Sequence, residues 1–138
     1  MYYEMKYRVP YADTDQMGVV YYANYLEYFE RGRTEMFRDA GMPYSRMESE
    51  GIFMPVSEAN CRYFNSARYD DLLTFRSYVS EYSRVRIKIC TGVLRDDLLL
   101  ASGYVVLACV NREFKVTRLP QWMTRFCDKC LAPEGETK

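Results

Sequence analysis

Apolar side chains recur at steps of three and four residues through positions 22–40, and this spacing predicts one long amphipathic helix. The expected apolar face consists of Tyr22, Tyr25, Leu26, Phe29, Gly32, Met36 and Ala40. Gly32 would let another backbone approach closely. Gly41 and Pro43 end the pattern, because glycine accepts a left-handed cap and proline cannot continue a helix. We expect about 18 residues, or roughly 27 Å, which is enough to cross a sheet.

Alternation of apolar and polar residues, the period of a half-buried strand, recurs through most of the remaining chain. Strands are expected over residues 3–9, 53–64, 73–79, 85–93 and 98–110, with a hairpin turn between the last two. The order of one strand, one helix and four strands predicts an α+β fold, in which an antiparallel sheet of about five strands wraps around the helix. We divide the chain into a folded domain at residues 1–126 and a C-terminal tail at residues 127–138.

The last expected strand, residues 98–110, is apolar on both of its alternating faces. One helix can cover only one side of the sheet, so the other side is expected to pack against another subunit or against the remaining strands. We therefore expect a homodimer or a tetramer built from dimers, with the active site at the subunit boundary.

Composition narrows the class of protein. The 138 residues are 49% hydrophobic, which is enough for one domain with a core. Nineteen basic and nineteen acidic residues balance, so the chain lacks the basic excess typical of nucleic-acid binding. The first ten residues are too charged for a signal peptide, and the uncharged stretch at residues 98–110, 13 residues long, is shorter than the ~20 of a membrane helix. We expect a cytoplasmic protein with neither nucleic-acid binding nor membrane insertion.

Five cysteines, an odd number without a recognisable secretion signal, are expected to be reduced thiols. Cys127 and Cys130 have the spacing of metal ligands. A closed zinc site takes four ligands, however, and the chain offers neither a second such pair nor a histidine. We prefer to interpret the two residues as tail cysteines without a role, and we expect no metal and no cofactor.

The sequence contains no histidine, which excludes serine–histidine and cysteine–histidine nucleophilic systems within this chain. Carboxylates, tyrosines, lysines and thiols remain as acids and bases. Asp15 precedes the expected helix, whose first N–H groups have no intrahelical partners. A carboxylate there could attack an acyl carbon or activate water while the amides stabilise the oxyanion. The alternative is that Asp13 or Asp15 only binds loop amides, as aspartate often does.

The run DTDQMGVVYYANY at residues 13–25, followed by FER at 29–31 and RTE at 33–35, resembles the hot-dog-fold acyl-CoA thioesterases. It is similar in particular to the 4-hydroxybenzoyl-CoA thioesterase family, which includes thioesterases encoded with the Tol-Pal system. The similarity extends to ARYDDLL at 67–73 and RLP at 118–120 and covers most of the chain. It implies a hot-dog fold, in which the sheet wraps the long helix and two subunits join their sheets into one.

The same resemblance implies hydrolysis of thioesters of coenzyme A or of an acyl carrier protein. Asp15 would be the catalytic carboxylate, and the backbone amide of Tyr22 would polarise the thioester carbonyl. Many Tol-Pal-type members have histidine where this chain has Tyr22, whereas the 4-hydroxybenzoyl-CoA enzyme has tyrosine, and a role of the N–H survives either side chain. A non-catalytic acyl-thioester binding module is the alternative, and a dehydratase on this fold would need a histidine.

Substrate-binding residues are expected in the loop before the helix, at the end of the second strand and just after it, and among the arginines. They are Gly18, Val19, Tyr63, Ser66, Arg84, Arg86 and Arg118. Each arginine could meet a coenzyme A phosphate through charge-assisted hydrogen bonds. Arg84, Arg86 and Lys88 alternate along one expected strand face, however, and a solvated outer sheet face is the preferred interpretation of these charges.

Overall fold

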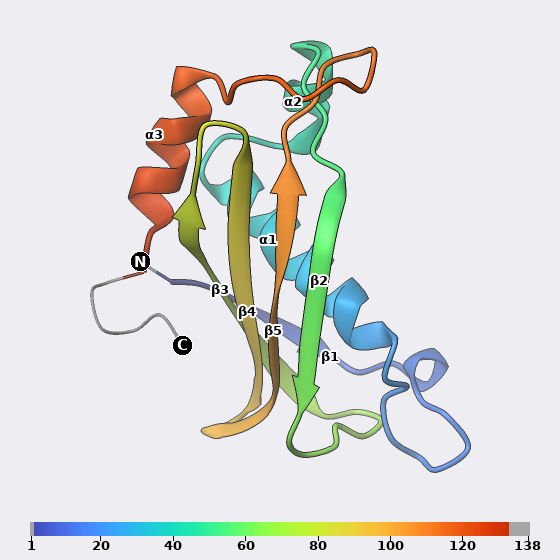
Figure 1. Ribbon diagram of the computed structural model, residues 1–138. Coiled ribbons are helices and arrows are strands. Elements are labelled where there is room, and N and C mark those ends of the chain that lie inside the picture. The colour runs from blue at the N-terminus through green and yellow to red at the C-terminus, as the bar shows by residue number, and fades with distance from the viewer. Residues whose placement is uncertain (1, 133–138) are drawn as a thin grey trace.

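The computed structural model describes residues 2–132 as one antiparallel sheet with three α-helices (Figure 1). The strands are β1 (Tyr3–Arg8), β2 (Val56–Tyr63), β3 (Leu72–Tyr82), β4 (Arg86–Arg95) and β5 (Leu98–Ala108), and they lie in the order β1-β3-β4-β5-β2. The helices are α1 (Asn24–Asp39), α2 (Tyr44–Ser49) and α3 (Gln121–Cys130), and a 3-10 turn, η1, spans Tyr11–Asp13. The predicted α+β architecture and its five strands are confirmed.

The alternation expected for residues 85–93 is present in β4. On β4, Ile87, Ile89 and Val93 are buried, whereas Lys88 and Cys90 between them are only half-buried. On β5, Val105 and Leu107 are buried, whereas Tyr104 and Val106 beside them are half-buried. The buried faces of these central strands form the surface against which α1 packs, and α1 contacts all five strands.

Close packing of α1 on the sheet depends on Gly32. A Cβ atom at this position would lie 2.7 Å from the hydroxyl oxygen of Ser77 on β3. That hydroxyl is itself buried and hydrogen-bonded to Thr91 on β4 at 3.0 Å, so it cannot easily move aside. The close approach predicted for Gly32 is therefore confirmed.

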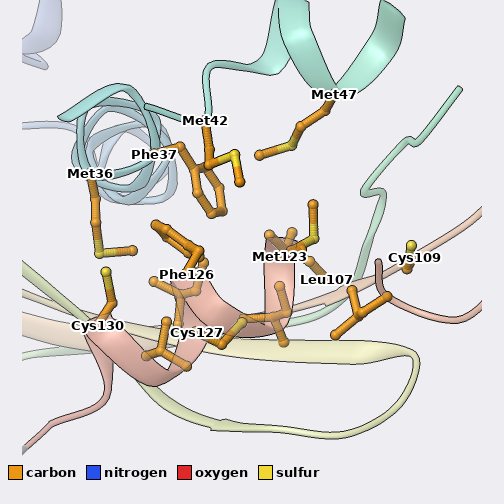
Figure 2. Packing of buried hydrophobic residues seen from close by; sticks show 14 of the residues in the cluster. Met36, Phe37, Met42, Met47, Leu107, Cys109, Met123, Phe126, Cys127 and Cys130 are labelled. Carbon is orange, nitrogen blue, oxygen red and sulfur yellow. The ribbon is translucent and has the colours of Figure 1, made fainter. Parts of the chain in front are cut away.

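The larger core cluster joins α1, α2 and α3 to one end of the sheet (Figure 2). The rings of Phe37 on α1 and Phe126 on α3 lie 4.8 Å apart between their centroids. A second cluster fills the other end, where Tyr28 on α1 stacks on Phe75 at 5.0 Å. Burial of these large side chains on both sides of Gly32 fixes the position of α1 along its whole length.

Helix α3 was not predicted from the sequence, because no element was expected after the strand at residues 98–110. Met123, Phe126, Cys127 and Cys130 have the spacing of one helical face, and all four are buried. The expected boundary between residues 126 and 127 falls inside this helix, and residues 133–138 of the expected tail lie outside the described residues. The described part of that tail is thus a piece of the core.

The buried face of α1 also differs from the predicted one. Leu26 is 42% exposed and Tyr22, before the helix, is 62% exposed, although both were assigned to the apolar face. Tyr28, Arg33 and Phe37 are buried instead. The helix is rotated so that its largest aromatic residues face the sheet, which buries more apolar surface than the predicted face would.

No helix within residues 2–132 is long and apolar enough to cross a membrane. The five cysteines are all free thiols, and burial raises the pKa of Cys127 to about 12. A thiol with such a pKa stays protonated and unreactive at neutral pH. Cys127 is therefore a packing residue, as its position between α3 and the sheet in Figure 2 also indicates.

Replacing Cys127 by serine should destabilise the fold, because a hydroxyl without a partner would enter an apolar core. We expect the free energy of unfolding, measured by urea titration, to fall by about 1–3 kcal/mol. Cys90→Ser is the matched control on the half-buried outer face of β4, and it should change stability by less than about 0.5 kcal/mol. Equal losses at the two positions would contradict the role assigned to Cys127.

Candidate active site

Residues 14–20 form a tight hairpin that carries Asp15 at its start. The Asp15 N–H donates to the carbonyl of Val19 at 2.9 Å, and the Gly18 N–H donates to the carbonyl of Asp15 at 3.0 Å. Gly18 has a φ of +80°, which glycine adopts without strain. The Oδ1 atom of Asp15 accepts a hydrogen bond from the Met17 N–H at 2.8 Å. Asp15 thus binds a loop amide with one oxygen, while its Oδ2 has no partner among the described residues.

Asp13 ties this hairpin to β1 and α1. Its Oδ2 accepts hydrogen bonds from the hydroxyls of Tyr7 and Tyr28, each at 2.8 Å, and its backbone carbonyl accepts the Tyr21 N–H at 2.9 Å. Burial, together with the hydrogen bond to Asp13, raises the pKa of Tyr7 to about 12 and also raises the pKa of Tyr28. Both phenols therefore remain donors at neutral pH, and Asp13 fixes the residue that precedes Tyr22.

Tyr22 lies in the turn that leads into α1. In the described part of the chain, its N–H and that of Ala23 donate to no other group, and no side chain caps the helix. The Tyr22 carbonyl accepts a hydrogen bond from the Tyr63 hydroxyl at 3.0 Å, and the ring of Tyr63 packs edge-on against Tyr25 at 5.2 Å. Free N–H groups at a helix start attract an oxygen that carries negative charge.

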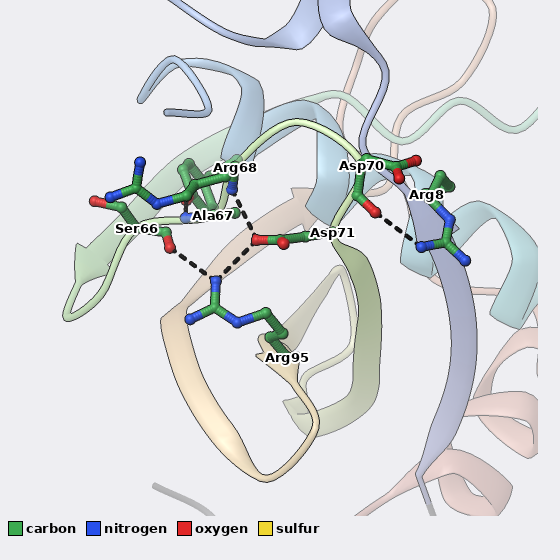
Figure 3. Close-up of polar contacts among 8 residues, drawn as sticks. Arg8, Ser66, Ala67, Arg68, Asp70, Asp71 and Arg95 are labelled. Carbon is green, nitrogen blue, oxygen red and sulfur yellow. Dashed lines mark hydrogen bonds and ion pairs between the residues drawn. The ribbon is translucent and has the colours of Figure 1, made fainter. Parts of the chain in front are cut away.

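Hydrogen bonds and an ion pair hold the turn that follows β2 (Figure 3). Asp71 accepts hydrogen bonds from the Arg68 N–H at 2.9 Å and from the guanidinium of Arg95 at 2.8 Å. Arg95 also donates to the carbonyl of Ser66 at 3.1 Å. The Asp71–Arg95 ion pair is about three-quarters buried, so it is less screened by solvent than a surface pair and it fixes the shape of the turn.

The same turn is joined to the Asp15 hairpin through the backbone. The Val20 N–H donates to the carbonyl of Ala67 at 2.8 Å, and Val19 forms an isolated bridge with Arg68. Of the expected substrate-binding residues, Gly18 and Val19 thus lie in the hairpin, and Tyr63 and Ser66 lie next to it. The segment ARYDD of the sequence holds the Asp15 loop in position.

The arginines that were expected to meet coenzyme A lie at the other end of the sheet. β3 begins beside β1 near the Asp15 loop and ends at Tyr82, and Arg84 lies in the turn that follows (Figure 1). Arg84 and Arg118 line one cavity of about 420 Å³, where the Leu119 N–H donates to the Arg84 carbonyl at 2.7 Å. Within one protomer, these side chains are therefore not brought together with Asp15.

Arg84 does not share a strand face with Arg86 and Lys88, because β4 begins only at Arg86. Arg86 and Lys88 line a separate cavity of about 280 Å³ on the outer face of the sheet. The Lys88 ammonium lies over the ring of Tyr104 at 4.2 Å, as in many solvated cation–π pairs. The preferred interpretation, a charged outer face, holds for these two residues but not for Arg84.

Sequence reasoning missed the role of Tyr7 and Tyr28 as donors to Asp13. A signal was present, since Tyr28 follows Tyr25 by three residues and a buried tyrosine usually needs a partner for its hydroxyl. The pattern could not say which acceptor it meets, because β1 and α1 come together only in the fold. No group of three or more cysteine, aspartate or glutamate side chains within residues 2–132 is arranged to hold a metal ion.

A model of the thioesterase-like superfamily matches residues 9–126. The chain belongs to this superfamily. The acyl-CoA thioesterase YbgC of Haemophilus influenzae is 37% identical over 105 residues, which cover 75% of this chain and 77% of that protein. Among solved structures, protein TT1821 from Thermus thermophilus is 31% identical, with a TM-score of 0.89 over 96% of this chain and 100% of that one. The DHNA-CoA thioesterase from Staphylococcus aureus is 30% identical, with a TM-score of 0.85 over 92% and 87% of the two chains.

Membership in the thioesterase-like superfamily confirms the resemblance drawn from the DTD motif, and the structural likenesses confirm the hot-dog fold. The chain is a thioester hydrolase, and the alternative of a non-catalytic binding module is not favoured. The geometry agrees with this chemistry, because the loop before α1 carries a carboxylate oxygen and two amides that have no partner among residues 2–132.

Loss of the Asp13 carboxylate should destabilise the site loop. Asp13→Ala leaves two phenols without their acceptor, so we expect the free energy of unfolding to fall by about 2 kcal/mol or more. Asp13→Asn keeps one acceptor oxygen and should lose less. Urea denaturation of both variants beside wild type measures the difference. If Asp13→Ala is as stable as wild type, the Asp13 carboxylate does not anchor the loop.

The same anchor predicts a pH dependence. The folded state raises the pKa of Tyr7 from 10.0 to about 12, so the stabilisation is complete below pH 10 and is lost as the pH rises toward 12. The wild-type melting temperature should therefore drop over this interval, and it should drop less in the double variant Tyr7→Phe with Tyr28→Phe. Parallel curves for the two proteins would argue against this source of alkaline instability.

Proposed function

We propose that this protein hydrolyses acyl-CoA thioesters at the Asp15 loop, with Asp15 as the reacting carboxylate and the Tyr22 N–H as the donor to the thioester oxygen. One observation carries the assignment. Asp15 Oδ2 and the Tyr22 N–H lack partners among the described residues, although the atoms around them are hydrogen-bonded. This loop is well anchored, yet it leaves one acceptor and one donor free. Such a loop is suited to bind a reacting group.

The chemistry follows from these two groups. As a general base, Asp15 takes a proton from water, the resulting hydroxide adds to the acyl carbon, and the thioester oxygen becomes an oxyanion facing the helix amides. The carbon–sulfur bond then breaks and the thiolate leaves, which needs no strong acid because the pKa of a thiol is only about 8.5. As a nucleophile, Asp15 would instead bond to the acyl carbon, expel the thiolate and form an anhydride that water cleaves.

A second protomer is needed to enclose the acyl group. The Tyr22 side chain is 62% exposed in one protomer, whereas ligand sites usually bury most of a small ligand. β2 is an edge strand of the sheet, and an unpaired edge can pair with an identical strand around a two-fold axis. We therefore propose a homodimer through β2 or a tetramer built from such dimers. The expected cytoplasmic location stays a prediction.

Antiparallel pairing of two β2 strands also explains the distant arginines. It brings the Val56 end of one strand to the Tyr63 end of the other. The Val56 end is in register with Leu107, and Leu107 with Ile87, which is close in sequence to Arg84. The cavity of Arg84 and Arg118 in one copy thus lies toward the active-site end of the other. Guanidinium groups there can bind the phosphates of coenzyme A.

Asp15→Asn keeps the shape of the side chain and removes its charge and its basic oxygen. Turnover should fall by about a hundredfold or more, the scale of general-base catalysis, while an unreactive acyl-CoA analogue binds about as tightly as to wild type. Asp97→Asn, an exposed change in the β4–β5 turn, is the matched control and should be fully active. An Asp15→Asn protein that folds and retains near wild-type turnover defeats the assignment.

Arg84→Gln combined with Arg118→Gln should raise KM for acyl-CoA by about tenfold or more, because each lost phosphate contact weakens binding. The value of kcat should change little. The same acyl group carried on N-acetylcysteamine has no phosphate, so its hydrolysis should not respond, and Arg125→Gln is the exposed control on α3. Equal effects on the two thioesters would remove these arginines from the site. Acyl carrier protein loaded with the same acyl group tests the alternative carrier.

A further inference from the structure

Arg33 is the one charged side chain that is buried among residues 2–132, and its guanidinium lacks a partner there. It is 7% exposed, and its Nε–H is inaccessible to solvent and donates to no group of the described residues. No carboxylate of the described chain lies within ion-pair distance of it. Such an arrangement is costly unless a further group supplies an acceptor.

The side chain lies at a cavity of about 350 Å³ between α1 and the edge of the sheet. The other residues that line it are Leu26, Glu27, Glu30, Val56, Ala59 and Val105. Leu26 and Val56 are 42% and 48% exposed, so apolar side chains of both the helix and the edge strand remain uncovered. In Figure 1, α1 lies behind β5 and β2 in this region. The cavity therefore opens at the same edge whose backbone groups are unpaired.

The charges along this cavity complement a second copy of the chain. Glu27 is paired with Arg31 at 3.2 Å, but Glu30 is exposed and forms no ion pair within residues 2–132, although it precedes Arg33 by only three residues. In a two-fold interface, residue i of one copy meets residue j of the other, and j meets i. A surface that carries one unpaired cation and one unpaired anion can thus satisfy both by facing its own copy.

We propose that this cavity is where α1 of a second copy packs, and that Arg33 of each copy binds Glu30 of the other. The inference rests on the proposed dimer and identifies the contact that selects it. Pairing of the β2 edges alone would tolerate a shift along the strand, whereas a buried charge pair fixes the register of the two protomers. It also buries the exposed Leu26 and Val56.

Charge reversal tests the contact. In a dimer of Arg33→Glu, residues 30 and 33 are both carboxylates. In a dimer of Glu30→Arg, both are guanidinium groups. Each variant alone should lose affinity for itself by at least about thirtyfold, because like charges would meet in a desolvated interface. Mixed together, or co-expressed with different tags, the two should form a heterodimer in which both pairs are restored. Mass-resolved light scattering and native mass spectrometry measure the species, and Glu48→Arg on α2 is the exposed control.

The outcomes separate this contact from the rest of the proposed function. A monomeric wild type at micromolar concentration overturns both the dimer and the contact. A dimeric wild type whose two variants stay dimeric, or whose mixture fails to form the heterodimer, overturns the contact alone. If assembly is unchanged but KM for long acyl-CoAs rises, the cavity holds the acyl group and not a second copy. Co-expression keeps the test decisive if Arg33→Glu does not fold alone.

Discussion

The contact between Gly32 and Ser77 sets the height of α1 above the sheet, and the position of the free amides at the start of α1 follows from it. A helix with any side chain at residue 32 would have to lift away, since even a Cβ would come within 2.7 Å of the Ser77 hydroxyl. Tyr22 lies ten residues before Gly32, or about 15 Å along the helix axis. Because a packed helix moves as a rigid element, a shift at the crossing would carry the Tyr22 amide away from the loop that holds Asp15.

Two aspartates separated by one residue have different roles because their partners differ. Asp13 receives two phenolic hydroxyls and has become an anchor, whereas Asp15 receives one backbone N–H and retains a free oxygen. Without histidine, the protein has no side chain that is half-protonated near neutral pH by default. Catalysis at the proposed site then depends on fixed geometry, and Tyr7 and Tyr28 contribute to it without adding charge beside the proposed reacting carboxylate.

The parts of this structure that could be predicted are those decided by short-range patterns. Alternation in β4 and the close approach at Gly32 are properties of neighbouring residues and of one residue type. Helix α3 had a readable signal in the spacing of Met123, Phe126 and Cys127, but the assignment of residues 127–138 to a tail without a role hid this helical pattern. The Asp13 anchor and the buried Arg33 depend on contacts between distant segments. For a helical arginine the usual expectation is a solvated face, which the fold overrides here.

Three incomplete features of the protomer lie along one side of it, and a single cause accounts for them. The Asp15 loop is open, β2 has an unpaired edge, and Arg33 has no acceptor among the described residues. Each is unfavourable in isolation: an open site admits water, a bare edge invites aggregation and a buried unpaired charge costs free energy. A second copy at β2 would close the Asp15 loop, pair the β2 edge and give Arg33 an acceptor at the same time. Catalysis and assembly would then be linked, since dissociation at low protein concentration would open the site as it exposed the edge.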